Sequence, residues 1–353
     1  MEQINERLVK EFKLKSFQVE NAIKLIDDGN TIPFIARYRK EQTGEMSDEQ
    51  LRDMFDRLNY LRNLEKRKEE VIRLIDEQGK LTDELKQSVL SSDTMTEVED
   101  LYRPYKQKKR TRATIAKEKG LEPLAIIIYS QDKKYDLMKL AEEFINEEKG
   151  ILSVDDAIAG AKDIVAEMIS DVAEYRKDIR KIIYGKGVIT SKATKDEKSV
   201  YEMYYDYAEA VSKIPSHRIL AINRGEKEEF LKVKIDGTDE TSLEYLKGKV
   251  IKNESPYEEV LEDVIEDAYK RLIKPSVENE VRNDLTSVAE EQAIKVFGQN
   301  AKKLLLQPPL KGLTVMGFDP AYRTGCKIAV IDETGKLLDT TTVYPTEPQN
   351  DVI

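Results

Sequence analysis

A short stretch of the sequence gathers residue types that bind phosphate groups. This basic connector (Arg103–Arg112) is free of acidic residues and holds six bases: Arg103, Lys106, Lys108, Lys109, Arg110 and Arg112. The chain as a whole is acidic, with a formal net charge of -10 at pH 7. A local inversion of sign in an acidic chain is typical of a surface that faces nucleic-acid phosphates. A solvated loop, or an intramolecular clamp for one of the acidic helices, would have the same composition.

A second group of bases lies nearer the N-terminus. The apolar segment Ile32–Ala36 leads directly into Arg37, Arg39 and Lys40, the N-terminal basic patch. These side chains could add phosphate contacts, although a solvated helix end would carry them equally well. Contacts of this kind hold the backbone of a nucleic acid and do not read its sequence.

The one pattern that resembles a catalytic site lies around Asp319. Residues 317–330 read G-F-D-P-A-Y-R-T-G-C-K-I-A-V, which predicts a strand, an aspartate, a turn and a second strand. In ribonuclease H-like folds, an aspartate in this position helps to hold two divalent ions. Such chemistry needs several converging carboxylates, and Asp332 and Glu333 lie in a turn at the far end of the strand. We therefore predict no catalytic residue and no bound metal, and expect Asp319 to be inactive.

Local signals predict the helices that hold the basic connector. A capping-box spacing places the start of one helix at Thr94, and Pro104 ends it near Arg103. A second helix is expected to begin after Thr111 or Thr114. The basic connector would then join two helices.

Longer helices are expected to form a scaffold around it. Ser47 caps a helix that runs to Gln78, roughly 45 Å long, with an apolar stripe at helical spacing. Ser153 caps another, whose apolar stripe continues to Ile183. The tyrosine-rich residues 200–211 predict a further helix.

Strand patterns occur in two places. Gly187–Lys195 and Phe230–Ile235 predict a small β element within the helical part. The helical pattern then breaks at Gln307–Leu310. Three antiparallel strands are predicted after this break, over 313–320, 326–331 and 337–343. Because three strands with one uncovered face make an incomplete domain, we expect the sequence to be a fragment, or to end in the start of a domain whose remainder is absent.

Composition excludes several classes of protein. The sequence has no run of about 18 apolar residues, so no membrane-spanning segment is predicted. A single cysteine, Cys326, cannot form an intramolecular disulfide and fits a reducing cytoplasm. With one histidine, His217, the usual zinc sites are excluded as well. Neither a phosphate loop nor a nucleophile elbow occurs, and no cofactor is predicted.

Four segments together resemble the bacterial Tex family of transcription accessory proteins. They are T-I-P-F-I-A-R-Y-R-K-E-Q-T-G (31–44), the basic connector with its flanks (100–125), S-H-R-I-L-A-I-N-R-G-E (216–226) and G-F-D-P-A-Y-R-T-G-C-K-I-A-V-I-D (317–332). The resemblance implies a helical N-terminal region with a helix-turn-helix-like part, then a YqgF-type ribonuclease H-like domain without a complete nuclease site. It also implies that helix-hairpin-helix modules and an S1 domain follow in the family, whose members bind nucleic acid and act in transcription.

These observations combine into one prediction. The fold class is mainly α: an elongated multi-helix scaffold over 1–310, with a helix-turn-helix-like part and a small β element near 187–236. The first strands of an incomplete ribonuclease H-like (YqgF) α/β domain follow over 311–353. We expect a non-enzymatic cytoplasmic scaffold that contacts the backbone of RNA or DNA, with RNA polymerase or other transcription proteins as candidate partners. Two alternatives stay open: a metal-dependent ribonuclease H-like nuclease, and a protein-interaction scaffold that uses the acidic residues of 258–267.

Overall fold

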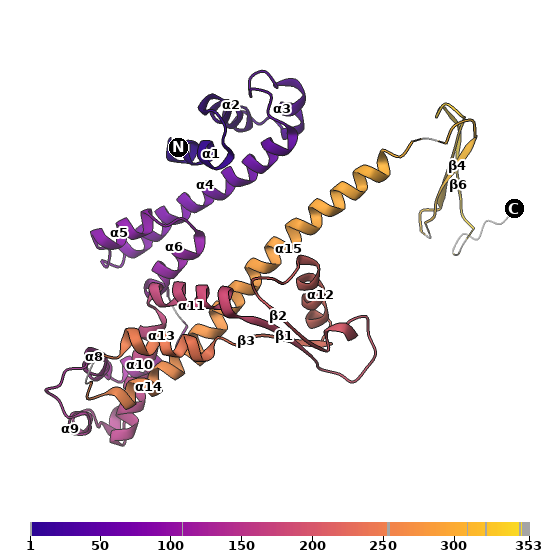
Figure 1. The fold of residues 1–353 in the computed structure, drawn as a ribbon. Coiled ribbons are helices and arrows are strands. Elements are labelled where there is room, and N and C mark those ends of the chain that lie inside the picture. The colour runs from indigo at the N-terminus through magenta and orange to yellow at the C-terminus, as the bar shows by residue number, and fades with distance from the viewer. Residues whose placement is uncertain are drawn as a thin grey trace. The chain divides into compact units, whose positions relative to one another are not determined.

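The computed structural model describes residues 2–107, 109–252, 255–308, 310–321, 323–345 and 347. Most of its elements are helices, and two small antiparallel sheets accompany them, which confirms the mainly α fold class (Figure 1). The described chain forms two compact units. Unit 1 comprises Met1–Ile214 and Ala221–Leu285, and unit 2 comprises Pro215–Leu220 and Thr286–Ile353.

Four helices share an apolar core in the N-terminal part of unit 1. They are α1 (Glu2–Phe12), α2 (Ser16–Asp27), α3 (Ile32–Tyr38) and α4 (Asp48–Asp76). Leu51 and Leu58, from the predicted stripe of the long helix, are buried in this core with Leu8 and Ile35. The predicted capping box is confirmed, because the Ser47 side chain accepts a hydrogen bond from the backbone N–H of Gln50 at 3.1 Å.

The second half of α4 contributes to another core. Its residues Leu64 and Val71 are buried with Val89 of α5 (Asp83–Leu90) and Val98 of α6 (Met95–Tyr102). A 3₁₀ turn, η1 (Arg103–Tyr105), follows α6, and α7 begins further on (Arg112–Glu118). Both helices predicted to flank the basic connector are therefore present.

The rest of unit 1 is built mainly from six helices. They are α8 (Glu122–Ser130), α9 (Leu137–Glu142), α10 (Val154–Ser170), α11 (Ala173–Lys186), α13 (Asp239–Val250) and α14 (Glu258–Asp267). The single helix predicted from Ser153 to Ile183 is wrong, because the chain breaks between α10 and α11. The break lets α10 pack on α7, α8 and α14 while α11 packs on α6 and α13. The apolar stripe has the same period on both helices, so the sequence pattern continues across the break.

The predicted β element is a three-stranded antiparallel sheet. Its strands are β1 (Val188–Ala193), β2 (Asp206–Ala210) and β3 (Leu231–Asp236), in the order β2-β1-β3. The helix predicted over 200–211 is wrong: these residues form a 3₁₀ turn, η3 (Glu202–Tyr204), and then β2. Pairing with β1 decides the outcome, and tyrosine is well suited to a half-buried sheet surface.

Two glutamates cover the outer edge of β3. The backbone N–H of Val233 donates to Glu226 Oε1 at 3.3 Å, and that of Ile235 donates to Glu278 Oε1 at 2.7 Å. Glu226 belongs to α12 (Ser216–Lys227) and Glu278 to α15 (Lys274–Leu305). An open strand edge invites pairing with other chains, and these carboxylates occupy donors that such pairing would use.

A π-helical turn, Ala268–Ile273, joins α14 to α15. Its hydrogen bonds run from residue i to i+5, so it is wider than an α-helical turn. Both Tyr269 and Ile273 of this turn are buried, and the Tyr269 hydroxyl donates to Asp239 Oδ1 at 2.8 Å. The turn is therefore fixed by packing and by a polar contact to α13.

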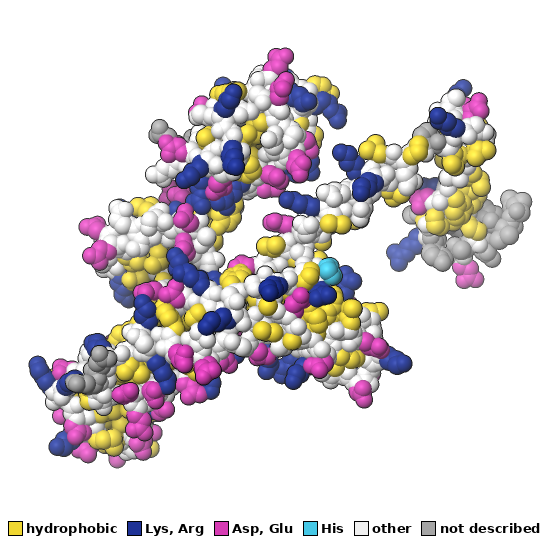
Figure 2. All heavy atoms as spheres, viewed as in Figure 1, with side chains coloured by type: hydrophobic (Ala, Val, Ile, Leu, Met, Phe, Trp, Pro, Cys, Tyr) yellow, Lys and Arg dark blue, Asp and Glu magenta, His cyan; other side chains and the backbone are white. Residues whose placement is uncertain are grey.

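Unit 2 contains the second sheet. Its strands β4 (Val315–Asp319), β5 (Cys326–Ile331) and β6 (Leu337–Val343) are antiparallel and adjacent in chain order, as predicted. Large apolar side chains on this sheet are exposed, including Met316 and Phe318, and Figure 2 shows hydrophobic side chains gathered over it. Among the described residues of the whole chain, no helix is both long and apolar enough to cross a membrane.

Candidate nucleic-acid interface

The helices on the two sides of the basic connector, α6 and α7, both begin with a threonine cap. Thr94 accepts a hydrogen bond from the Glu97 backbone N–H at 3.2 Å and starts α6. Thr111 accepts from the Thr114 backbone N–H at 3.0 Å and starts α7. The Thr111 hydroxyl also donates to the Glu167 carboxylate of α10 at 3.1 Å. The basic connector is thus a short segment between two capped helices.

The basic connector exposes four of its side chains to solvent: Lys106, Lys109, Arg110 and Arg112. Arg110 forms an ion pair with Glu118 at 2.8 Å, but it is 70% exposed, so the pair is worth only about 0–1 kcal/mol. Lys106 and Lys109 form no ion pair with any residue that the structure describes. The predicted site residue Lys108 lies outside the described residues.

Arg103 has a different environment from the rest of the basic connector. Its side chain is 33% exposed, and its Nε lies 3.6 Å from Oδ1 of Asp171. Burial, followed by the nearby charge of Arg176, lowers the pKa of Arg103 from its ordinary value. Arg103 therefore anchors the root of the connector, and less of its charge faces solvent.

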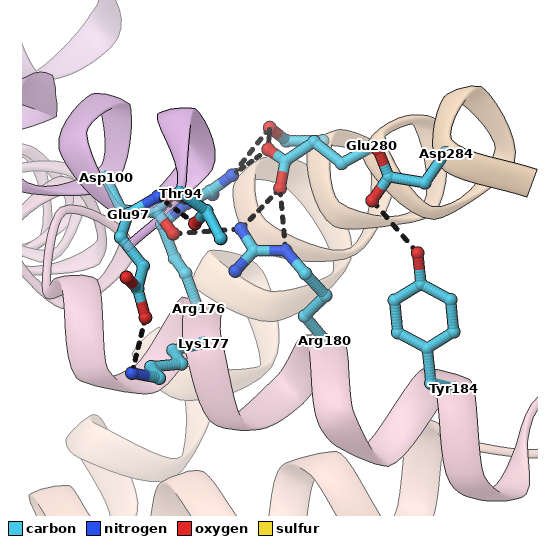
Figure 3. Close-up of polar contacts among 10 residues, drawn as sticks. Thr94, Glu97, Asp100, Arg176, Lys177, Arg180, Tyr184, Glu280 and Asp284 are labelled. Carbon is cyan, nitrogen blue, oxygen red and sulfur yellow. Dashed lines mark hydrogen bonds and ion pairs between the residues drawn. The ribbon is translucent and has the colours of Figure 1, made fainter. Parts of the chain in front are cut away.

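Behind the connector lies a buried ion network of Asp100, Arg176, Arg180 and Glu280 (Figure 3). Asp100 of α6 accepts from Arg176 Nε and from Arg180 Nη2, both at 2.8 Å. Glu280 of α15 pairs with both arginines, which belong to α11. Three helices distant in sequence are thereby joined at the root of the basic connector.

Glu280 and Arg180 keep their charges in this network despite burial. Burial alone would raise the pKa of Glu280, but hydrogen bonds and charges from Arg180 and Arg176 hold it below its ordinary value. Burial likewise disfavours the charged form of Arg180, yet Glu280 and Asp100 raise its pKa. A buried charge without its partner is costly, so the network fixes the relative positions of the three helices.

The N-terminal basic patch lies at the end of α3. Arg37 and Lys40 are exposed and line a hollow together with Arg52 of α4. The Arg39 guanidinium lies over the Phe34 ring, 5.1 Å from its centroid, so its charge is partly occupied by an internal contact. Arg37 and Lys40 are therefore the better placed members of the patch.

The structure adds two basic residues that sequence reasoning missed. Arg52 reaches the N-terminal basic patch because α3 packs on α4, and it pairs with Asp48 at 2.6 Å. Lys80 follows Gln78, whose side-chain amide donates to the Tyr105 carbonyl at 2.9 Å and so brings this segment beside the connector. Neither position has a sequence signal, because each depends on packing between separate segments.

The two basic surfaces do not form one site. The N-terminal basic patch contacts the first turns of α4, whereas the basic connector lies beyond its last turn. With 29 residues in α4, its ends are about 43 Å apart. A single ligand would have to be long to reach both surfaces.

Asp319 ends β4 and is exposed beside Lys327 of β5, its partner in the sheet register. It lines a hollow with Gly317 and Thr340. Among the described residues, no group of three or more histidine, cysteine, aspartate or glutamate side chains could hold a metal ion. Asp319 thus lies beside a lysine and small side chains.

The acidic residues of α14 are largely compensated within unit 1. Four of them form ion pairs with internal bases: Glu262 with Lys247, Asp263 with Lys162, Glu266 with Lys270 and Asp267 with Arg271. These acids are therefore less available to a basic partner protein than their number in the sequence indicates.

Three family models match the sequence in order along the chain. They are described as "Tex-like protein N-terminal domain" over residues 2–76, "Tex central region-like" over 132–297 and "Tex protein YqgF-like domain" over 313–353. The first includes the N-terminal basic patch, and the last includes Asp319 and the second sheet.

Curated relatives match nearly all of the chain. "Uncharacterized protein YdcI" of Bacillus subtilis (strain 168) is 52% identical, over 98% of this chain and 49% of that protein. "Transcriptional accessory protein Tex" of Neisseria gonorrhoeae is 39% identical, over 97% of this chain and 46% of that protein. "S1 RNA-binding domain-containing protein 1" of Homo sapiens is 33% identical, over 92% of this chain and 34% of that protein. The chain spans about half the length, or less, of these curated relatives.

Proposed function

This chain belongs to the Tex family, and on that premise we propose that it is a nucleic-acid-binding transcription accessory factor without enzymatic activity. Its helices form a scaffold, its basic surfaces contact the phosphate backbone of RNA or DNA, and it acts in the cytoplasm. The names of two relatives, a transcriptional accessory protein and an S1 RNA-binding domain-containing protein, support this class of function.

One observation carries the proposal: the exposed, uncompensated bases of the basic connector. An intramolecular clamp would place these bases against acids, as the structure does for Arg103 and Arg110. Within the described part of the chain, Lys106 and Lys109 have no such partner. Because the chain has a net charge of -10, a loop of this sign attracts polyanions against the overall field. A phosphate backbone is the polyanion that a transcription factor meets.

The test is fluorescence-anisotropy binding of labelled single-stranded RNA and duplex DNA at several salt concentrations. The connector variant Lys106→Gln/Lys109→Gln/Arg110→Gln should lose about tenfold in affinity, to the same extent for every sequence. A plot of the logarithm of the binding constant against the logarithm of the salt concentration has a negative slope. For single strands the magnitude of this slope should decrease by about 2, because each phosphate contact removed accounts for about 0.7.

A matched control makes the same change of charge elsewhere. Lys24→Gln/Lys86→Gln/Lys139→Gln removes three exposed lysines from α2, α5 and α9 and should bind like the wild type. If the connector variant binds as tightly as this control, the basic connector does not bind nucleic acid.

The same protein tests the absence of enzymatic activity. We expect no cleavage of labelled RNA or DNA in the presence of Mg²⁺ or Mn²⁺. Metal-dependent cleavage that Asp319→Asn abolishes would instead establish the nuclease alternative.

We also propose RNA polymerase or another transcription protein as a partner, on the strength of the family alone. Because four acids of α14 are ion-paired internally, Glu258 and Glu259 are the exposed acids most open to a basic partner. Purified polymerase retained by the immobilised chain would support the partnership. Retention that is equal on a blank matrix would refute it.

A further inference from the structure

The outer face of the first sheet carries a second group of exposed lysines, which is separate from the basic connector. Alternate residues of a strand point to the same face. In the register of this sheet, Lys192 of the central strand β1 lies directly opposite Lys232 of β3, and Thr190 lies opposite Lys234. We call the three exposed lysines, Lys192, Lys232 and Lys234, the lysine face. None of them forms an ion pair with another residue that the structure describes.

The uncharged positions on this side of the sheet are Val188, Thr190, Ala208 and Ala210. All but Val188 are small, so a ligand can approach the backbone closely at those three. Two acids, Asp206 and Asp236, lie at opposite corners. The Asp236 carboxylate accepts a hydrogen bond from the Thr190 hydroxyl at 2.7 Å, so it is already engaged.

Lys192 has a like charge opposite it on one neighbouring strand and an acid opposite it on the other. Like charges directly opposite each other destabilise an antiparallel pair of strands. On its other side Lys192 faces Asp206 of β2 in the register, yet these two described residues form no ion pair. This side of the sheet therefore carries more lysines than acids, and its lysines form no ion pair with the described residues.

Protection of the sheet edge does not account for these lysines. Edge strands often carry lysine to prevent pairing with other chains, and β3 is an edge strand. Its outward N–H groups at Val233 and Ile235, however, already donate to Glu226 and Glu278. Lys192 moreover lies on the central strand, where no edge needs protection.

We propose that the lysine face binds the phosphate backbone of single-stranded nucleic acid. The Cα atoms of Lys232 and Lys234 are about 6.6 Å apart along β3. The backbone of Lys192 lies about 4.8 Å from that of Lys232, which is the spacing of neighbouring strands. A flat face of this kind has no protruding helix or ribbon to enter a groove of a duplex, but an extended strand can lie along it. The inference rests on the proposed function and adds a second contact surface to it.

The test compares three variants of the 353-residue chain, each with three bases changed to glutamine. They are the lysine-face variant Lys192→Gln/Lys232→Gln/Lys234→Gln, the connector variant and the matched control defined above. Binding to labelled oligouridine, to oligothymidine of equal length and to a duplex is measured by anisotropy at several salt concentrations. Circular dichroism and thermal unfolding confirm that each variant is folded.

We expect the lysine-face variant to lose about tenfold in affinity for both single strands, and its salt slope to fall by about 2. Its affinity for the duplex should equal that of the control. Equal losses for RNA and DNA identify the phosphate as the ligand, whereas a loss confined to RNA would assign the contact to the ribose hydroxyl and overturn phosphate binding.

The remaining outcomes separate the two proposals. A lysine-face variant that matches the control, while the connector variant loses affinity, overturns this inference and leaves the proposed function intact. A loss in the lysine-face variant alone supports the inference and removes the connector from the proposed function. Absence of binding by the wild type overturns both, and an equal loss on the duplex overturns the choice of a single strand.

Discussion

At the residue scale, the charged side chains divide by where their partners lie. Arg103 has Asp171 as an internal partner, whereas Lys106 and Lys109 have none within the described residues. Sequence alone treats all three as members of one basic connector. The difference is physical, because a base that is already paired must give up its partner before it can bind a phosphate.

The buried ion network makes a prediction at this scale. Asp100→Asn leaves the guanidinium groups of Arg176, which is 0% exposed, and Arg180 without one of their two carboxylates. The free energy of unfolding should fall by about 3–5 kcal/mol, measured by urea denaturation. Glu97→Gln, on the same helix, breaks a partly exposed pair with Lys177, keeps a side-chain oxygen for the Asp93 backbone N–H, and should cost at most about 1 kcal/mol. Equal effects of the two changes would contradict a special role for burial.

The lowered pKa of Glu11 should make the free energy of unfolding depend on pH. A hydrogen bond from Arg57 is the largest influence on this carboxyl, and with Arg7 it lowers the pKa of Glu11 from 4.5 to about 2 despite partial burial. A depressed pKa in the folded state gives stability that is complete above about pH 4.5 and is lost as the pH falls toward 2. Glu11→Gln should therefore flatten the unfolding free energy between these pH values.

The check on Glu11 is a series of urea titrations across that pH range. Arg57→Gln should flatten the same interval, since it removes the other half of the pair. Parallel pH profiles for wild type and Glu11→Gln would show that the pair does not couple to folding.

The candidate site could be predicted only in part from the sequence. The charge of the basic connector and the caps at Thr94 and Thr111 are local, so they were predictable. The roles of Arg52 and Lys80 depend on packing against α3 and on the Gln78–Tyr105 contact. Contacts between residues this far apart leave no periodic signal in a single sequence.

At the element scale, the lysine face should lower the stability of the first sheet, because the charges that favour phosphate binding also repel one another. Lys232→Gln removes one of two opposed lysines and leaves the register pair of Lys192 and Asp206 in place, so the unfolding free energy should rise by about 0.2–1 kcal/mol. Lys234→Gln is the comparison variant: Thr190 lies opposite Lys234, so its repulsion from the other two lysines acts over a longer distance and the rise should be smaller. Urea denaturation measures both, and a less stable Lys232→Gln protein would refute the repulsion.

The elements also show where sequence patterns suffice. Ser47 and an uninterrupted apolar stripe define α4, and the observed helix differs from the prediction only at its last residues. Residues 200–211 carry tyrosines that suit either a helix or a sheet, and only β1 decides between them. The break between α10 and α11 is equally non-local, because it serves packing on different neighbours.

At the scale of the whole molecule, the two sheets should differ in hydrogen exchange. Every residue of β6 has an exposed side chain, whereas β1 and β3 bury alternate residues. Backbone hydrogen bonds that lack buried apolar cover open more readily. Amides of β4–β6 should therefore exchange faster than those of β1 and β3, as measured by mass spectrometry after deuteration. Equal protection of both sheets would contradict this expectation.

The π-helical turn Ala268–Ile273 determines how the chain tolerates changes in its length. Inserting one residue in α-helical geometry between this turn and Glu278 would rotate everything that follows by about 100°. Glu278 would then turn away from Ile235, and Glu280 away from Arg176 and Arg180. Both sets of contacts would be lost although none of their residues is altered. At this point of the chain, the number of residues is under stronger constraint than their identity.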